Sequence, residues 1–263
     1  MSDSEGEKGT LQACNTLWIG ESLSPIERAC LRSMTRVGHE VRLFCYDVPR
    51  NLPEGVETVD ARELLPEHVI VLHRTGSPAL FSDWFRYEVM RRSLGLWVDT
   101  DMYLLRPVVP TGPYVVGEQE PGVANGAVLL LPPDSPLLPP LIAIFRERSI
   151  PAWLPPLEKA KAWARRAVGP SGVATMPWGT AGPHALTALL KKEGLWDLVL
   201  PREAFYPVDW RDALWVLDPS QKLEDKIGES TIGIHLWSSR LASFDPASAP
   251  KGSFMARLAL EGR

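Results

Sequence analysis

Apolar and polar residues alternate along the N-terminal part of the chain in a pattern that predicts strands separated by a helix. Short apolar or alternating runs at residues 17–19, 41–46 and 56–59 indicate strands. Between the first two, Ser24-Pro25 suits an N-cap followed by a first-turn proline, and Gly38 suits the helix end. This succession of strand, helix and strand predicts an α/β fold with a mostly parallel sheet and right-handed crossovers.

A second helix is bracketed by Ser77-Pro78, again an N-cap and a first-turn proline, and by Gly95 at its expected end. The apolar residues 96–98 that follow predict a buried strand, which delivers Asp99 and Asp101 to its carboxyl end. Ligand sites of open α/β sheets lie at that end. The two aspartates are therefore the first candidates for a functional site.

The pattern is less regular after the aspartates, above all beyond Pro201. We expect three short strands at residues 103–105, 114–117 and 127–131. Three helices are expected at residues 136–148, 156–168 and 182–193, and one late strand at residues 231–235. The length of 263 residues fits a single α/β domain with a full core.

Composition and charge narrow the functional classes. The formal net charge of −4 gives no electrostatic reason to expect nucleic acid as a partner. Cys14, Cys30 and Cys45 are too few and too scattered for a disulfide framework or a zinc site, and fit a reducing compartment. No apolar run approaches the roughly 18 residues that cross a bilayer, and the acidic N-terminus has no signal-peptide pattern. We expect a cytoplasmic protein with a disordered tail at residues 1–12.

Four ionisable side chains are expected to converge near the predicted strand end. Asp83 and Arg86 lie three apart on the second helix, and Asp99 and Asp101 lie two apart on an extended segment. This arrangement suits a divalent metal ion that holds a diphosphate. The alternatives are a solvated turn for the aspartates and a surface ion pair for Asp83 and Arg86.

The segment 82–107 resembles the signature of the DXD-motif glycosyltransferases of family 32, which are related to the family 8 galactosyltransferases and the clostridial glucosylating toxins. That signature runs Ser-Asp-x-x-Arg-Tyr, a spacer ending in Gly-Gly, an aromatic residue and then Asp-x-Asp. Here Leu96 replaces the second glycine and Trp97 the usual tyrosine. Further blocks resemble the family in order, at residues 17–20, 30–46, 182–183, 205–207 and 235–239.

The resemblance implies a GT-A fold and a metal-dependent, retaining transfer of a hexose. The donor would be a nucleotide sugar, most simply UDP-linked, and the acceptor a glycan or lipid-linked oligosaccharide in surface polysaccharide synthesis. The cofactor would be Mn²⁺ or Mg²⁺. We expect a single domain over residues 13–245, with a nucleotide-sugar half at 13–110 and an acceptor half at 111–245, followed by a tail or helix at 246–263.

The resemblance also assigns roles to individual residues. Asp101 would bind the metal, and Asp99 would contact the metal, the ribose or the sugar. His235 ends an apolar strand, where it would complete the metal shell or serve as a hydrogen-bonded structural residue. Asp83 and Arg86 would contact the donor sugar and phosphate.

Other donor contacts are expected at an aromatic residue, an amide and a late loop. Trp18 would stack on the base or belong to the core. Asn125 would lie near the donor sugar. The late loop comprises Trp237, Ser238 and Ser239. It would bind the diphosphate through indole and hydroxyl donors, with Arg240 assisting, or it would be an ordinary loop with a packing tryptophan.

The identity of a protein nucleophile stays open at the level of sequence. Glu118, Gln119 and Glu120 lie near the expected end of a strand and could face the reacting carbon. Of these, Gln119 and Glu118 are the candidates for a double displacement, whereas a front-face mechanism needs no such residue.

Residues 153–168 form a basic amphipathic stretch that carries Lys159, Lys161, Arg165 and Arg166 beside Trp153 and Trp163. It predicts either peripheral contact with an anionic membrane or a solvated helix face.

Two rival functions remain open from the sequence. One is a sugar nucleotidyltransferase, although residues 21–24 lack the expected glycine-rich, basic loop. The other is a sugar-nucleotide-binding pseudoenzyme, although Asp99 and Asp101 are intact.

Overall fold

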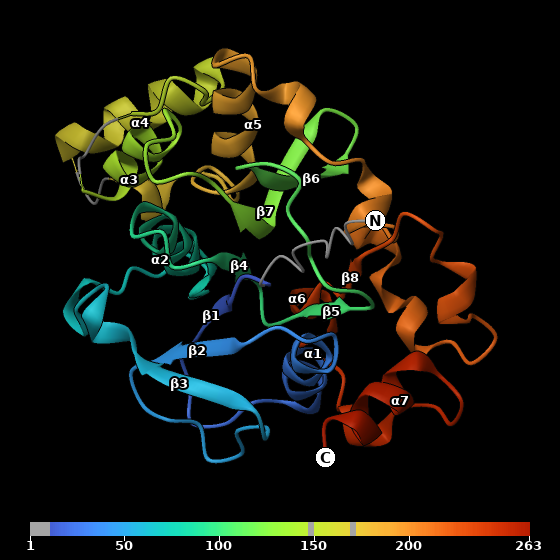
Figure 1. Cartoon of the computed structure of the whole chain (residues 1–263). Helices are drawn as coiled ribbons and strands as arrows, with labels where there is room; N and C mark the ends of the chain where they lie inside the picture. Colours follow the sequence, from blue (N-terminus) through green and yellow to red (C-terminus); the bar gives the residue numbers. More distant parts are fainter. Residues whose placement is uncertain (1–10, 147–149, 169–171) are drawn as a thin grey trace, which may run out of the picture.

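A six-stranded sheet forms the centre of the protein (Figure 1). The computed structural model describes residues 11–146, 150–168 and 172–263. The strands follow the order β3-β2-β1-β4-β7-β6 across the sheet. Their bounds are β1 Cys14–Trp18, β2 Val41–Cys45, β3 Val56–Asp60, β4 Leu96–Val98, β6 Val115–Glu120 and β7 Val123–Leu130.

The first four of these strands are parallel, and the β6–β7 hairpin adds antiparallel strands beside β4. The chain leaves β1 to build β2 and β3 on one side, then returns to place β4 on the other side of β1. This reversal makes the carboxyl ends of β1 and β4 the switch point of the sheet, where ligands of such folds bind. The predicted α/β class with a mostly parallel sheet is confirmed, and the architecture is consistent with the expected GT-A fold.

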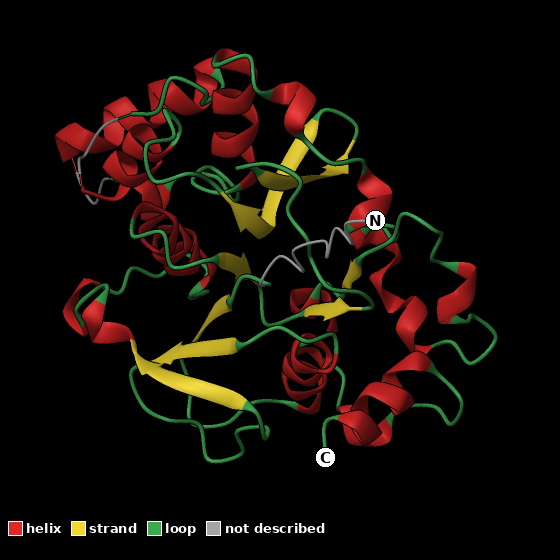
Figure 2. Cartoon of the chain, in the orientation of Figure 1, coloured by secondary structure: helices red, strands yellow, loops and turns green. Residues whose placement is uncertain are grey.

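Helices cover both faces of the sheet (Figure 2). Side chains alternate between the two faces: Trp97 packs with Phe81 and Phe85 of one helix, whereas Leu96 packs with Leu31 of another. The helices are α1 Pro25–Arg36, α2 Ala79–Arg91, α3 Leu138–Arg146, α4 Pro156–Val168, α5 Pro183–Lys192, α6 Ser238–Leu241 and α7 Phe254–Glu261. Helix α7 packs against α1, so the C-terminal segment belongs to the same body.

A small two-stranded sheet brings the end of the chain back to the aspartates. Strand β5, Met102–Leu104, pairs antiparallel with β8, Gly233–His235. The register sets Met102 opposite His235, and the backbone N–H of Leu236 donates to the carbonyl of Asp101 at 3.0 Å. These contacts place His235 directly beside Asp101.

The second helix is shorter than its sequence pattern predicts. It begins at Ala79, where the Ser77 hydroxyl accepts from the Ala79 N–H at 3.2 Å, and it ends at Arg91. Gly95 therefore does not end the helix. At a φ of +116° its backbone approaches β1, and a Cβ atom there would lie 2.7 Å from the carbonyl oxygen of Ala13.

The strands are mostly predicted at the right place and differ in length. Strand β1 begins at Cys14, before the predicted residue 17, and β6 extends to Glu120, beyond the predicted residue 117. A single 3₁₀ turn, η1 Ala61–Glu63, follows β3. The C-terminal half contains further 3₁₀ turns, including η3 Val173–Thr175 and η6 Trp210–Leu217, as the irregular pattern predicts.

Two predictions about the chain ends stay untested. Residues 1–10 of the predicted tail lie outside the described residues, and the division of the domain at residues 110 and 245 stays a prediction. Within the described ranges, the protein has no helix with the length and apolar character needed to span a bilayer.

Candidate active site

A cleft of about 720 Å³ lies at the carboxyl ends of β1 and β4. It is walled by the start of α2, by the segment around η3 and by the residues after β8. The predicted site residues among its lining are Trp18, Asp83, Arg86, Asp99, Asp101, Asn125, His235, Trp237, Ser238 and Ser239. Residues that lie far apart in the sequence therefore share one cavity at the switch point of the sheet.

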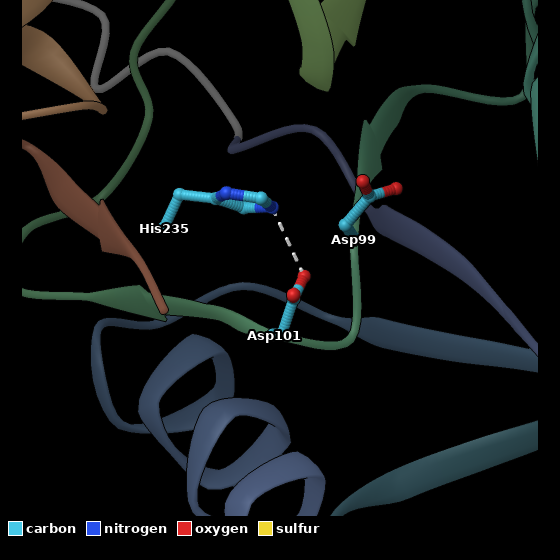
Figure 3. A group of neighbouring side chains, drawn as sticks. All are labelled: Asp99, Asp101 and His235. Carbon is cyan, nitrogen blue, oxygen red and sulfur yellow. Dashed lines mark ion pairs between the residues drawn. The ribbon is translucent and has the colours of Figure 1, made fainter. Parts of the chain in front are cut away.

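Asp101 and His235 both line the cleft, and their side chains point toward one another (Figure 3). The Nε2 atom of His235 lies 3.2 Å from Oδ1 of Asp101, and the backbone N–H of Ser238 donates to Oδ2 at 2.9 Å. Trp237, which precedes Ser238, adopts a left-handed conformation at φ 55° and turns the chain so that this N–H faces the carboxylate. The Asp101 carboxylate is thus held by one donor on each oxygen.

Asp99 is held by a different set of partners. Oδ1 of Asp99 accepts from the indole N–H of Trp97 at 2.6 Å and lies 3.0 Å from Nη2 of Arg86. The same Arg86 nitrogen lies 3.6 Å from Asp83. One buried guanidinium therefore links the carboxylates of α2 and of the segment after β4.

Burial and pairing shift the ionisation of these groups in opposite directions. Burial raises the pKa of Asp83 to about 6, although Arg86 opposes the shift. Burial also raises the pKa of Asp99, again against Arg86. Burial would raise the pKa of Asp101, but His235 and the Ser238 N–H together hold it well below its usual range. For His235, the burial that lowers its pKa is outweighed by Asp101, so the pKa is raised.

Asp99, Asp101 and His235 fit a divalent metal ion. Each offers one ligand atom, and these atoms lie within 4.8 Å of one another. The Nδ1 atom of His235 is buried and has no hydrogen-bond partner, although a buried imidazole nitrogen normally has one. Carboxylates and imidazole are both common ligands of divalent metal ions in proteins.

A match to a known family covers the part of the chain that supplies the histidine side of this site. Residues 175–261 match the family model described as the alpha 1,4-glycosyltransferase conserved region. This match supports a glycosyltransferase enzyme of the family 32 type. The matched region contains the later blocks of the resemblance, at residues 182–183, 205–207 and 235–239. No curated protein matches the chain.

In this glycosyltransferase, two glycines allow the helix side chains to reach the cleft. A Cβ atom at Gly182 would lie 2.8 Å from both carboxylate oxygens of Asp83. A Cβ atom at Gly126 would lie 3.0 Å from Nη1 of Arg86. The glycine of the 182–183 block is therefore explained by the close approach of Asp83.

Trp18 and Trp237 line the cleft but differ in their indole N–H groups. The Nε1 atom of Trp18 is buried without a partner. The Nε1 atom of Trp237 donates to the carbonyl of Val208 at 3.0 Å. The predicted indole donor of Trp237 is therefore already engaged, and its ring packs at 4.1 Å between centroids against His235.

The glycosyltransferase does not direct the predicted nucleophile candidates into the cleft. Gln119 is absent from the cleft lining, and its Oε1 accepts from Nδ2 of Asn125 at 2.6 Å. Glu118 caps the β6–β7 turn by accepting from the Gly122 N–H at 2.6 Å. Glu120 pairs with Arg211 at 3.4 Å. The expectation that these residues face the reacting carbon does not agree with these positions.

Glu27, His73 and Trp178 are among the cleft residues that sequence reasoning missed. Glu27 caps α1 by accepting from the Ser24 N–H at 2.8 Å, so the Ser-x-x-Glu spacing could have located it. His73 and Trp178 pack edge to face with ring centroids 5.2 Å apart. They lie in loops that no periodic pattern identifies.

Proposed function

We propose that this glycosyltransferase is a metal-dependent, retaining enzyme that moves a hexose from a UDP-linked donor to a glycan or lipid-linked acceptor in surface polysaccharide synthesis. The observation that carries the proposal is the meeting of Asp99, Asp101 and His235 in one cleft at the switch point of the sheet. A lipid-linked acceptor would bring the enzyme to a membrane surface.

The three residues of this cluster would hold the metal ion, Mn²⁺ or Mg²⁺. A divalent ion at this position neutralises the charge that develops on a departing diphosphate. The residues themselves supply positioning. Asp101 is fixed by the Ser238 N–H and Asp99 by Trp97, so neither carboxylate needs to reorganise when the donor binds.

The rest of the cleft would bind the donor along its length. Asp83 and Arg86 face the cleft next to Asp99 and would hydrogen-bond the hydroxyls of the hexose. The hydroxyls of Ser238 and Ser239 would contact the diphosphate. Trp18 would contact the base, through its ring or through its unpartnered indole N–H.

We propose a front-face mechanism in which the acceptor attacks from the side of the departing diphosphate. Support comes from Gln119 and Glu118, whose side chains bond to Asn125 and to the β6–β7 turn and do not line the cleft. The matched family model is named for alpha 1,4-glycosyl transfer. An α-linked product from an α-linked UDP-hexose means retention of configuration, which agrees with a front-face reaction.

The decisive experiment measures hydrolysis and transfer of radiolabelled UDP-galactose and UDP-glucose with Mn²⁺, with Mg²⁺ and after EDTA treatment. We expect turnover that requires the metal and is lost by at least a hundredfold in Asp101→Ala. Asp197→Ala, which removes an exposed aspartate from the surface, serves as the matched control and should keep full activity. Wild-type rates for Asp101→Ala in EDTA would refute the metal-dependent proposal.

Thermal unfolding gives a second measurement that needs no acceptor. A ligand that binds only the folded protein raises the melting temperature. We expect UDP with Mn²⁺ to raise it, UDP with EDTA to have a smaller effect, and ADP or GDP to have a weaker effect than UDP. Equal stabilisation by all three nucleotides would contradict the choice of a uridine donor.

A further inference from the structure

Helix α4 presents an apolar outer surface that no other described element covers. Leu157 and Trp163 are 66% and 72% exposed, and Trp163 is the more exposed of the two. Exposed tryptophans of this degree are unusual, because their large apolar area favours burial. In Figure 1 the helix lies at the outer edge of the molecule, next to α3.

The exposed arc of α4 is apolar in its centre and basic at both edges. At about 100° per residue, Leu157, Ala164, Ala160 and Trp163 follow one another around the outward side of the helix. Lys161 lies at one edge of this arc. Lys159 and Arg166 lie at the other edge, four residues before and three residues after Trp163.

The opposite side of α4 is fixed to the protein. Ala162 is buried, and the Arg165 guanidinium donates to the carbonyl of Thr175 in η3 at 3.0 Å. Glu158, the acidic residue of the helix, pairs with Lys161 at 2.6 Å. The inner side of α4 therefore anchors the helix, and its outward residues are presented from a fixed position. Basic side chains outnumber acidic ones on the helix.

We propose that α4 is a docking surface for an anionic lipid bilayer. A bilayer interface accepts both features of the arc at once, because tryptophan and leucine enter the boundary of the acyl chains while lysine and arginine extend to the headgroups. The basic edges are complementary to anionic headgroups although the chain as a whole carries a formal charge of −4. Nucleic acid would use the cations but offers no apolar layer for Leu157 and Trp163.

This surface lies close to the active-site cleft. Arg165 bonds to Thr175, and Val173 in the same 3₁₀ turn lines the cleft. The inner side of α4 therefore contacts the η3 segment that lines the cleft, and the proposed lipid-facing arc is on the outer side of the same helix. The lipid-binding proposal itself does not depend on the nature of the reaction.

Vesicle flotation of the full chain tests the surface directly. We expect the protein to float with vesicles of phosphatidylcholine and phosphatidylglycerol at low salt, to remain behind with phosphatidylcholine alone, and to dissociate as salt is raised. The variant Lys159→Gln, Lys161→Gln, Arg166→Gln and the variant Leu157→Ser, Trp163→Ser should each reduce the lipid partition coefficient at least tenfold.

A matched control removes the same charge elsewhere, through Arg50→Gln, Lys192→Gln and Lys251→Gln, and should change the partition coefficient less than twofold. Failure of the wild-type protein to float, or an equal loss in this control, would overturn the proposal. Quenching by brominated phosphatidylglycerol gives a second test, because it should be markedly weaker in Trp163→Phe than in the wild type. Unchanged melting temperatures with UDP and Mn²⁺ in the α4 variants would separate lipid binding from donor binding.

Discussion

The Asp101 carboxylate lies 3.2 Å from Nε2 of His235, and this contact joins two distant parts of the chain at the active site. It follows from the pairing of β5 with β8, in which Met102 stands opposite His235. The aspartates follow β4, and the histidine comes from the region that matches the alpha 1,4-glycosyltransferase family model. A small antiparallel sheet therefore completes the site that the large sheet begins.

Metal affinity should rise with pH because a proton and the metal compete for His235. Asp101 raises the pKa of His235, so the imidazole is protonated in the metal-free protein over a wider pH range than usual. Metal binding requires the neutral imidazole and releases this proton. We expect the dissociation constant for Mn²⁺ to fall up to about tenfold per pH unit below that pKa. Isothermal titration calorimetry between about pH 5 and pH 8 measures it.

The control for this measurement is His235→Gln, which keeps a polar side chain without a titrating nitrogen. Its affinity should be weaker, and its pH slope should be smaller because no imidazole proton is displaced when the metal binds. The same pH slope in the variant and the wild type would show that another group controls metal binding.

Asp83→Asn should stabilise the protein near neutral pH while it lowers activity. Burial raises the pKa of Asp83 from 3.8 to about 6, so the fold disfavours the ionised carboxylate. The contribution of protonated Asp83 to the free energy of unfolding is therefore fully present below about pH 4 and is lost as pH rises through about 6. At about pH 7.5 the variant should gain about 1–3 kcal/mol in the free energy of unfolding, and at pH 4 almost nothing.

Urea denaturation at both pH values tests this prediction. Arg86 keeps its contact with Asp99 at 3.0 Å in the variant, so its charge stays paired. Asp197→Asn is the control and should change stability by less than about 0.5 kcal/mol, as surface substitutions usually do. A loss of stability at pH 7.5 in Asp83→Asn would show that the Arg86 contact outweighs the effect of burial.

The sequence was sufficient to identify the ionisable residues of the candidate site but not to define the bounds of the strands that position them. The spacing of Asp83 and Arg86, and of Asp99 and Asp101, correctly predicts their convergence. The start of β1 was missed because Asn15 and Thr16 are polar yet fully buried. The amide of Asn15 donates to the carbonyls of Leu94 and Leu96 at 3.0 Å each, a pairing that exists only once β4 lies beside β1.

Gln119 illustrates why side-chain direction was harder to predict than strand position. The strand was expected near it, but the β6–β7 pairing shifts register between Glu118 and Glu120. A shift of this kind reorients side chains relative to the simple alternation of a strand. A pattern of period two therefore cannot tell which way Gln119 points. His73 and Trp178 were missed for a different reason, because loop residues carry no periodic signal.

Gln119→Ala separates positioning from nucleophilic catalysis. Because Gln119 holds Asn125 at 2.6 Å and does not line the cleft, we expect kcat for transfer to fall by about tenfold or less. Asn125→Ala should have an equal or larger effect, since Asn125 lines the cleft itself. A loss of kcat of several thousandfold in Gln119→Ala, with normal folding and donor binding, would instead support a covalent role.

Gly126→Ala should disable the enzyme although residue 126 carries no functional group. Its Cβ atom would lie 3.0 Å from both Nη1 of Arg86 and a methyl carbon of Leu186, tighter than most packed contacts, so a neighbour must move by a few tenths of an ångström. Both neighbours are buried, but Nη1 is the end of a flexible side chain, so we expect Arg86 to shift relative to Asp83 and Asp99. We expect kcat/KM to fall at least tenfold and the free energy of unfolding to fall by about 1–3 kcal/mol, as is usual for overpacking.

Gly112→Ala, where a Cβ atom meets nothing within 4 Å, is the control and should leave kcat/KM and stability unchanged. Wild-type kinetics in Gly126→Ala would mean that the position of Arg86 does not matter for transfer.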